Sequence, residues 1–203
     1  MNAQTTDQEP ILTKSTTAPT DEYSLFFIYF LPIMIGMAKS DSFFIRAKVD
    51  WNGTNYAQNS IDLGAYVDAL GKSVLRIHRC EVVWDSPLDI PAVTADQNHG
   101  ASFQLTTQSQ TALVEATDKS VISSGTVLFS GGPPGTAGTQ MLSERINLGP
   151  QNWTNGYLVG VEQIYVACDQ TMTLFSGQFS VVLECTVETL SSAAAMALAL
   201  SQQ

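Results

Sequence analysis

The stretch SVLRIHRCEVVWD, residues 73–85, decides the fold, because its apolar and polar residues nearly alternate, as they do in a half-buried β-strand. Strict alternation would put charged and apolar side chains on both faces. One extra residue near positions 78–79, a β-bulge, resolves the conflict. Arg76, Glu81 and Asp85 then face outward. The core side of this predicted bulged strand consists of Leu75, Ile77, Cys80, Val82 and Trp84.

Further strand candidates lie on both sides of this stretch, separated by segments rich in Gly, Pro, Asn and Ser. Residues 52–59 and 86–100 have the composition of a turn and a long loop, and 61–71 is ambiguous, with apolar spacing that fits a short helix. About eight short strands with almost no helical period predict an all-β fold, an antiparallel β-sandwich or single jelly roll. The other predicted strands are 42–51, 102–107, 112–117, 121–129, 141–149, 157–168 and 171–190.

The two ends of the chain differ from this β-rich part. Residues 191–203 are rich in Ala and Leu and predict a short C-terminal helix capped by Ser191 or Ser192, which needs a docking surface to be stable. The polar residues 1–22 predict a disordered N-terminal arm. We therefore expect residues 1–41 to lie outside the fold, 42–190 to form the jelly-roll domain, and 191–203 to form the helical tail.

The stretch YSLFFIYFLPIMIGMA, residues 23–38, has no charged side chain and allows three interpretations. It is shorter than a membrane-spanning helix and contains Pro32 and Gly36, yet it suits contact with a membrane. Its length also fits the apolar part of a signal peptide, although an acidic segment precedes it. Finally, MAKSDSFF from Met37 resembles an ordinary start, so the stretch also fits a leader outside the folded domain.

Composition and motifs exclude several kinds of function. The formal net charge of −10 argues against direct binding of nucleic acid, which requires a local excess of Lys and Arg. Cys80, Cys168 and Cys185 form no CxxC pair, so no zinc site is expected, and His99 near Asp96 is a poor candidate for a metal or acid–base pair. No nucleophile elbow, phosphate-binding loop or zinc-protease motif occurs. We expect no enzyme, no cofactor and no metal.

The strand pattern over residues 42–190 resembles the single jelly-roll capsid proteins of icosahedral viruses. The resemblance rests on SFFIRAKVDW (42–51), SVLRIHRCEVVWD (73–85), YLVGVEQIYVACD (157–169) and FSGQFSVVLECTVE (175–188). It implies a self-assembling structural subunit located in the virion, whose partners are copies of itself and other virion proteins. The acidic arm departs from capsids that bind genomes with basic arms, and it fits better a capsid layered over an internal membrane, contacted through residues 23–38.

The small basic island of residues 73–85 is the candidate interface for assembly. An acidic chain that packs against itself must offset like-charge repulsion, and its few cations are the natural places. We expect the island to pair with Glu81 and Asp85 or with acidic groups of an adjacent copy. The predicted interface residues are Arg76, His78, Arg79, Glu81 and Asp85.

The alternative function is that of a secreted or cell-surface β-sandwich that binds carbohydrate or another protein. Exposed aromatic rings stack on sugars in such modules, and four aromatic residues lie in or beside predicted loops. The same residues also fit internal packing at the ends of a sandwich. They are Trp51, Tyr56, Trp153 and Tyr157.

Overall fold

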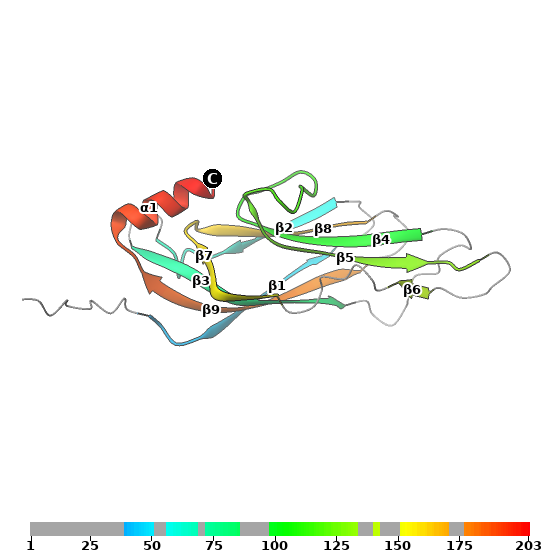
Figure 1. Ribbon diagram of the computed structural model, residues 1–203, viewed down its shortest axis with the longest axis horizontal. Coiled ribbons are helices and arrows are strands. Elements are labelled where there is room, and N and C mark those ends of the chain that lie inside the picture. Colours follow the sequence, from blue (N-terminus) through cyan, green and yellow to red (C-terminus); the bar gives the residue numbers. More distant parts are fainter. Residues whose placement is uncertain are drawn as a thin grey trace, which may run out of the picture. The chain divides into compact units, whose positions relative to one another are not determined.

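The computed structural model describes two packed β-sheets and one helix (Figure 1). The described residues are 39–50, 56–68, 72–85, 98–133, 140–142, 151–170 and 177–203. The elements are β1 (Phe43–Asp50), β2 (Tyr56–Asp62), β3 (Ser73–Asp85), β4 (Asn98–Thr106), β5 (Val121–Ser130), β6 (Gln140–Leu142), β7 (Gln151–Val159), β8 (Gln163–Gln170), β9 (Gln178–Thr189) and α1 (Ser192–Ser201).

The strand order is that of a single jelly roll. One sheet has the order β1-β9-β3-β7, and the other has the order β2-β8-β4-β5-β6. Every strand pair within the described sheets is antiparallel. From β1 to β4, and again from β6 to β9, each successive strand lies in the opposite sheet. This alternation is how two Greek keys form a double-sheet jelly roll. The all-β fold predicted from the sequence is confirmed.

The bulge predicted in β3 is also present. The pairing of β3 with both β7 and β9 changes register between Ile77 and Arg79. As a result, Leu75, Ile77 and Cys80 are all fully buried, although Ile77 and Cys80 are three positions apart. Without the extra residue, every side chain beyond Ile77 would point to the opposite face.

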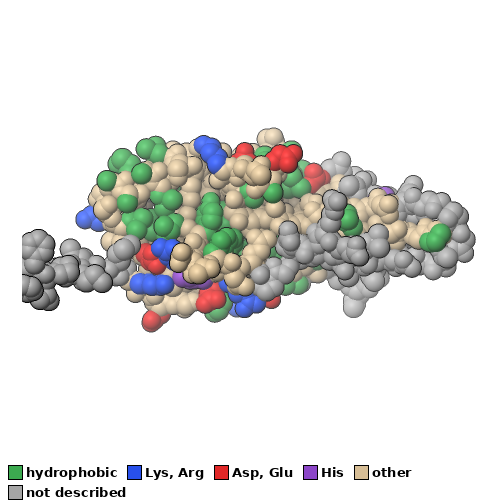
Figure 2. Space-filling view, in the orientation of Figure 1, with side chains coloured by type: hydrophobic (Ala, Val, Ile, Leu, Met, Phe, Trp, Pro, Cys, Tyr) green, Lys and Arg blue, Asp and Glu red, His purple; other side chains and the backbone are tan. Residues whose placement is uncertain are grey.

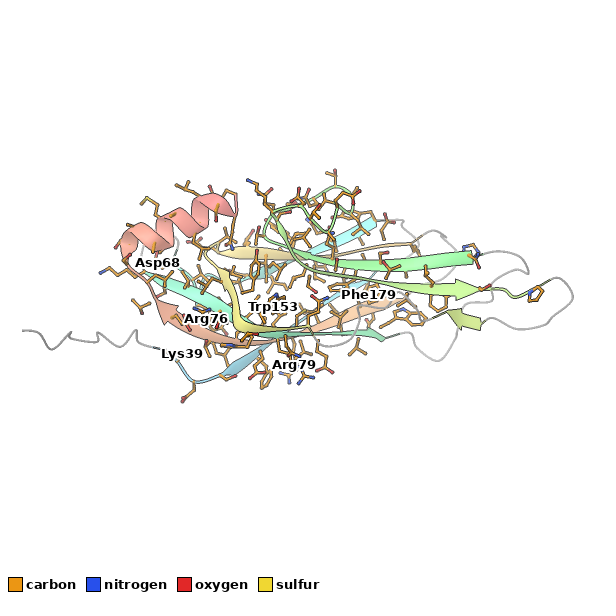
Figure 3. The ribbon with its side chains drawn as sticks, in the orientation of Figure 1. Lys39, Asp68, Arg76, Arg79, Trp153 and Phe179 are labelled. Atoms are coloured by element: carbon orange, nitrogen blue, oxygen red, sulfur yellow. The ribbon has the colours of Figure 1, made fainter. Side chains whose placement is uncertain are left out.

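The core lies between the two sheets and is closed by aromatic rings. Phe103 of β4 and Phe179 of β9 pack with ring centroids 5.8 Å apart, and Figure 3 places Phe179 between the sheets. Trp84 and Phe129 pack similarly at 4.9 Å. The buried apolar surface of such rings is the main favourable contribution to the stability of a sandwich. Three free, buried thiols complete this core: Cys80, Cys168 and Cys185.

Several segments differ from the sequence-based predictions. The predicted strand 157–168 is divided between β7 and β8 by residues 160–162, and Asn98 to Gly100, predicted as part of a loop, belong to β4. Residues 61–71 contain no helix over the described part: Ile61 and Asp62 end β2, and a single turn follows, closed by the Val67 N–H donating to the Leu63 carbonyl at 2.9 Å. Tyr56 to Asn59, predicted as a turn, already belong to β2.

Residues 112–117, predicted as a strand, form a loop instead. The side chain of Gln104 takes the place of a neighbouring strand, because its amide donates to the Val114 carbonyl at 2.7 Å and accepts from the Val114 N–H at 3.0 Å. The loop therefore satisfies its backbone without a ladder.

The C-terminal helix forms as expected and packs on its own sandwich. Ser191 caps it, its hydroxyl accepting from the Ala194 N–H at 3.3 Å. Ala195 and Ala199 are buried, and Leu198 and Ala199 lie against Gly160, which follows β7. The close approach of helix and backbone depends on the missing side chain at Gly160.

The bonding of the sandwich begins before the expected boundary at residue 42. Lys39 bridges to Glu188 in an antiparallel pairing, and the Ser40 N–H donates to the Val187 carbonyl at 3.0 Å. The predicted arm of residues 1–22 and the apolar stretch 23–38 lie outside the described residues. In the part of the chain that the structure describes, no helix is long and apolar enough to span a membrane.

Candidate functional site

The predicted island on β3 contains a largely buried ion pair. Arg76 Nε donates to Glu188 Oε1 at 2.7 Å, and Arg76 Nη2 donates to Oε2 at 2.6 Å. The two side chains are only 18% and 8% exposed. Arg76 is opposite Thr186 in the ladder, so Glu188 is its diagonal neighbour on the same face of the sheet. The bidentate geometry is the one that best repays the desolvation of a guanidinium and a carboxylate.

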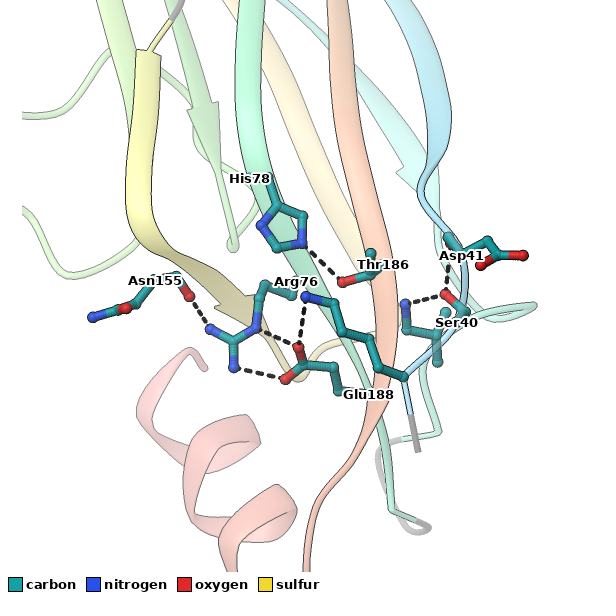
Figure 4. Close-up of polar contacts among 9 residues, drawn as sticks. Ser40, Asp41, Arg76, His78, Asn155, Thr186 and Glu188 are labelled. Atoms are coloured by element: carbon teal, nitrogen blue, oxygen red, sulfur yellow. Dashed lines mark hydrogen bonds and ion pairs between the residues drawn. The ribbon is translucent and has the colours of Figure 1, made fainter. Parts of the chain in front are cut away.

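Two further elements enclose this pair (Figure 4). Lys39 Nζ, just before β1, lies 3.7 Å from Glu188 Oε1, and the Asn155 carbonyl of β7 accepts from Arg76 Nη1. Gly156 adopts a positive φ of 70°, and a Cβ there would overlap the Arg76 side chain. β7 can therefore pass over the guanidinium because residue 156 is glycine.

The electrostatics of the pair fix its charge state. The hydrogen bonds from Arg76 lower the pKa of Glu188 below its ordinary value, and the same bonds raise the pKa of Arg76. Both groups are consequently charged across the whole physiological range. A pair of this kind has no proton to exchange. Its role is structural, because its hydrogen bonds join β3, β7 and β9.

His78 lies at the bulge, beside the ion pair. Its Nε2 is 2.9 Å from the Thr186 hydroxyl, which is buried. The imidazole is half-buried. This contact orients the ring along β9 and leaves His78 as part of the outer face of the sheet.

Within the chain, Arg79 pairs with Glu81, one of its expected partners, whereas Arg76 pairs with Glu188, which was not expected. Arg79 Nη2 lies 3.3 Å from Glu81 Oε2, and both side chains are nearly half exposed. Arg76 instead turns to Glu188, because the register of β9 brings a buried carboxylate beside it. The side chain of Asp85 lies outside the described residues. Arg79 and Glu81 thus remain on the outer surface, whereas Arg76 is already paired with a carboxylate of its own chain.

The aromatic residues of the alternative function are engaged within the fold. The Tyr56 hydroxyl lies 3.0 Å from Gln58 Oε1 and 3.1 Å from the Gln110 carbonyl. Trp153 and Tyr157 pack together at 6.1 Å between centroids and rest on the core. Burial raises the pKa of the Tyr56 and Tyr157 hydroxyls. Trp51 lies outside the described residues.

A polar groove lies where the ends of β2, β4 and α1 meet the start of β8. Its volume is about 590 Å³. No Lys or Arg lines this groove among the described residues, so it favours a neutral hydroxyl-bearing molecule over an anion. The side chains that line it include Asp62, Gln108, Ser109, Glu162, Gln163 and Tyr165.

Within the described ranges, no cluster of three or more His, Cys, Asp or Glu side chains is placed to hold a metal ion. Burial raises the pKa of Cys80 to about 11, and burial is also the main cause that raises those of Cys168 and Cys185 to about 12. The thiols are therefore protonated and unreactive at neutral pH. His99 is in β4, and its expected neighbour Asp96 lies outside the described residues.

Sequence reasoning missed two groups that the structure makes prominent. Glu188 gives no local signal, because it is a single carboxylate on a strand 112 positions from Arg76. Gln202 is almost fully buried at the end of the chain's helix, where sequence alone gives no reason to expect a buried amide. Comparison with models of known protein families found no match, and comparison with curated protein sequences found none either.

Proposed function

We propose that this protein is a self-assembling structural subunit of a virus shell. The observation that carries the proposal is the strand order, β1-β9-β3-β7 facing β2-β8-β4-β5, which is a jelly roll within one chain. This topology supports the proposal because it is the fold that the resemblance to single jelly-roll capsid proteins implies. Fold by itself does not fix function, so the surface of the molecule has to agree with it.

The charged groups of the described residues support a structural role. The most buried charges, Arg76 and Glu188, hold three strands of one sheet together and present no open reactive group. Only 14% of the chain is charged, and the net charge is −10. An acidic surface is unsuited to a genome, so we propose that the partners are copies of the chain and other virion proteins. An internal membrane, reached through residues 23–38, is a further proposed partner.

Light scattering after size exclusion, together with negative-stain electron microscopy, tests this function on the full chain. We expect oligomers of defined mass that grow into larger, regular assemblies as protein concentration rises. A single monomeric species at every concentration and salt condition would overturn the proposal.

A second candidate, a saccharide-binding module, is favoured by the polar groove. Carboxylates, amides and one tyrosine ring there could bind sugar hydroxyls and stack on a pyranose face. Glycan-array binding that is lost in Tyr165→Ala but kept in Tyr56→Phe would favour this candidate. Absence of binding to any glycan by the wild-type chain would reject it.

A further inference from the structure

We propose that the outward face of α1, formed by Ala193, Met196, Ala197 and Leu200, is a contact surface between two copies of this chain. The proposal rests on the assembly function above and names the part of the molecule through which subunits meet.

The helix is apolar on both sides, but the described chain covers only one. Ala195 and Ala199 face the sandwich and are buried, whereas Met196 and Leu200 are 51% and 64% exposed. In Figure 2, hydrophobic atoms of α1 form part of the molecular surface. A helix that is apolar all round is normally buried all round. The exposed side of α1 is therefore an apolar surface that none of the described residues covers.

Hydrogen bonds anchor the helix to the sandwich, so its exposed face is already ordered before a partner binds. The Gln202 side chain donates to the Leu158 carbonyl at 2.7 Å and accepts from the Gly160 N–H at 2.8 Å. The hydroxyl of Thr107 donates to the Gln202 carbonyl at 3.1 Å. A partner that binds α1 consequently does not have to order it, which lowers the entropic cost of association.

The charge pattern favours a second copy over a basic partner as the occupant. No charged residue occurs from residue 189 to residue 203, in a chain whose net charge is −10. A basic partner would be attracted to acidic side chains, and α1 offers none. Two copies of an acidic chain repel each other, and this repulsion is smallest when they meet through an uncharged surface.

The shape of the face also suits self-association. The small Ala193 and Ala197 alternate with the larger Met196 and Leu200, at helical spacings that place all four on one side of the helix. Across a twofold axis, the large side chains of one copy would lie over the alanines of the other. The result is a self-complementary helix pair.

The size of the face predicts how strong this contact is. A helix of 10 residues is about 15 Å long, and it offers much less than the roughly 800 Å² per partner of a standard stable interface. One such pair is weak on its own. Repeated over many subunits, weak contacts of this kind give a stable assembly by multivalency.

Paired variants of the full chain test the contact. We expect Met196→Glu combined with Leu200→Glu to weaken self-association by at least tenfold in sedimentation velocity. Glu is a good helix former, so α1 itself should persist. Ala194→Glu is the matched control: it adds a charge to the same helix but off this face, and it creates a capping box with Ser191. The control should associate like the wild type.

A cross-linking experiment identifies the surface independently. Ala197→Cys should give a disulfide-linked dimer under mild oxidation, whereas Ala194→Cys should not. The native thiols are all buried and do not compete. Equal cross-linking of both variants, or of neither, would overturn the inference.

The outcomes separate this inference from the proposed function. If the wild type assembles and the double variant assembles equally well, the helix contact is wrong and the assembly function stands. If the wild type never associates and Ala197→Cys forms no dimer, both are wrong.

Discussion

Arg76 is the residue whose replacement is expected to have the largest effect among the outer-face charges. Arg76→Met would leave the 8%-exposed Glu188 with Lys39, 3.7 Å away, as its remaining ion-pair partner among the described residues. Removing one partner of a buried pair costs about 3–5 kcal/mol, and we expect about 2–3 kcal/mol here because Lys39 remains. Chemical denaturation measures this loss. Arg79→Met is the control, since its exposed pair with Glu81 should contribute less than about 1 kcal/mol. Equal losses for the two variants would contradict the assignment of a buried clamp.

The same pair predicts how stability depends on pH. The folded-state pKa of Glu188 is lowered by Arg76, so its contribution is present above the ordinary pKa of 4.5 and is lost as pH falls through the lower folded value. Glu188→Gln lacks this contribution. The difference in free energy of unfolding between the wild type and Glu188→Gln, measured by urea denaturation, should therefore shrink from neutral pH to about pH 3. A difference that stays constant with pH would mean that Glu188 is not stabilised by its charge.

At the scale of elements, the position of α1 depends on Gly160. A Cβ at this position would lie 3.0 Å from Leu198 Cγ and 3.1 Å from the Ala199 nitrogen, so Gly160→Val should push the helix away from β7. We expect faster amide hydrogen exchange in α1, with the sheets unchanged. Gly64→Ala is the control, because its added Cβ meets only the Asp62 side chain, at 3.2 Å. Unchanged protection of α1 in Gly160→Val would show that the close contact does not hold the helix.

At the scale of the whole molecule, the net charge of −10 predicts the salt response of assembly. The screening length falls from about 30 Å at 0.01 M salt to about 10 Å at 0.1 M, which weakens repulsion between acidic copies. Contacts through the uncharged face of α1 are not weakened by salt. Self-association measured by light scattering should therefore increase with ionic strength. A decrease would indicate that oppositely charged groups, such as the exposed Arg79, dominate the contact.

The sequence by itself determined the features that depend on neighbouring residues. Alternation with one inserted residue predicted the bulge near positions 78–79, and the serines before an Ala-rich run predicted a helix cap at Ser191 or Ser192, of which the structure uses Ser191. These features are local, since side-chain direction follows from strand or helix period alone. The outward position of Arg79 and Glu81 follows from the same rule.

Only the tertiary structure decided which distant groups meet. The strand order sets β9 beside β3, and this places Glu188 next to Arg76 and makes the pair internal rather than available to another copy. It also let the Gln104 side chain replace a strand at Val114, and it buried Gln202 against Gly160. Local period carries no information on sheet order, because the pairing of distant strands is chosen by the burial and hydrogen bonding of the whole fold.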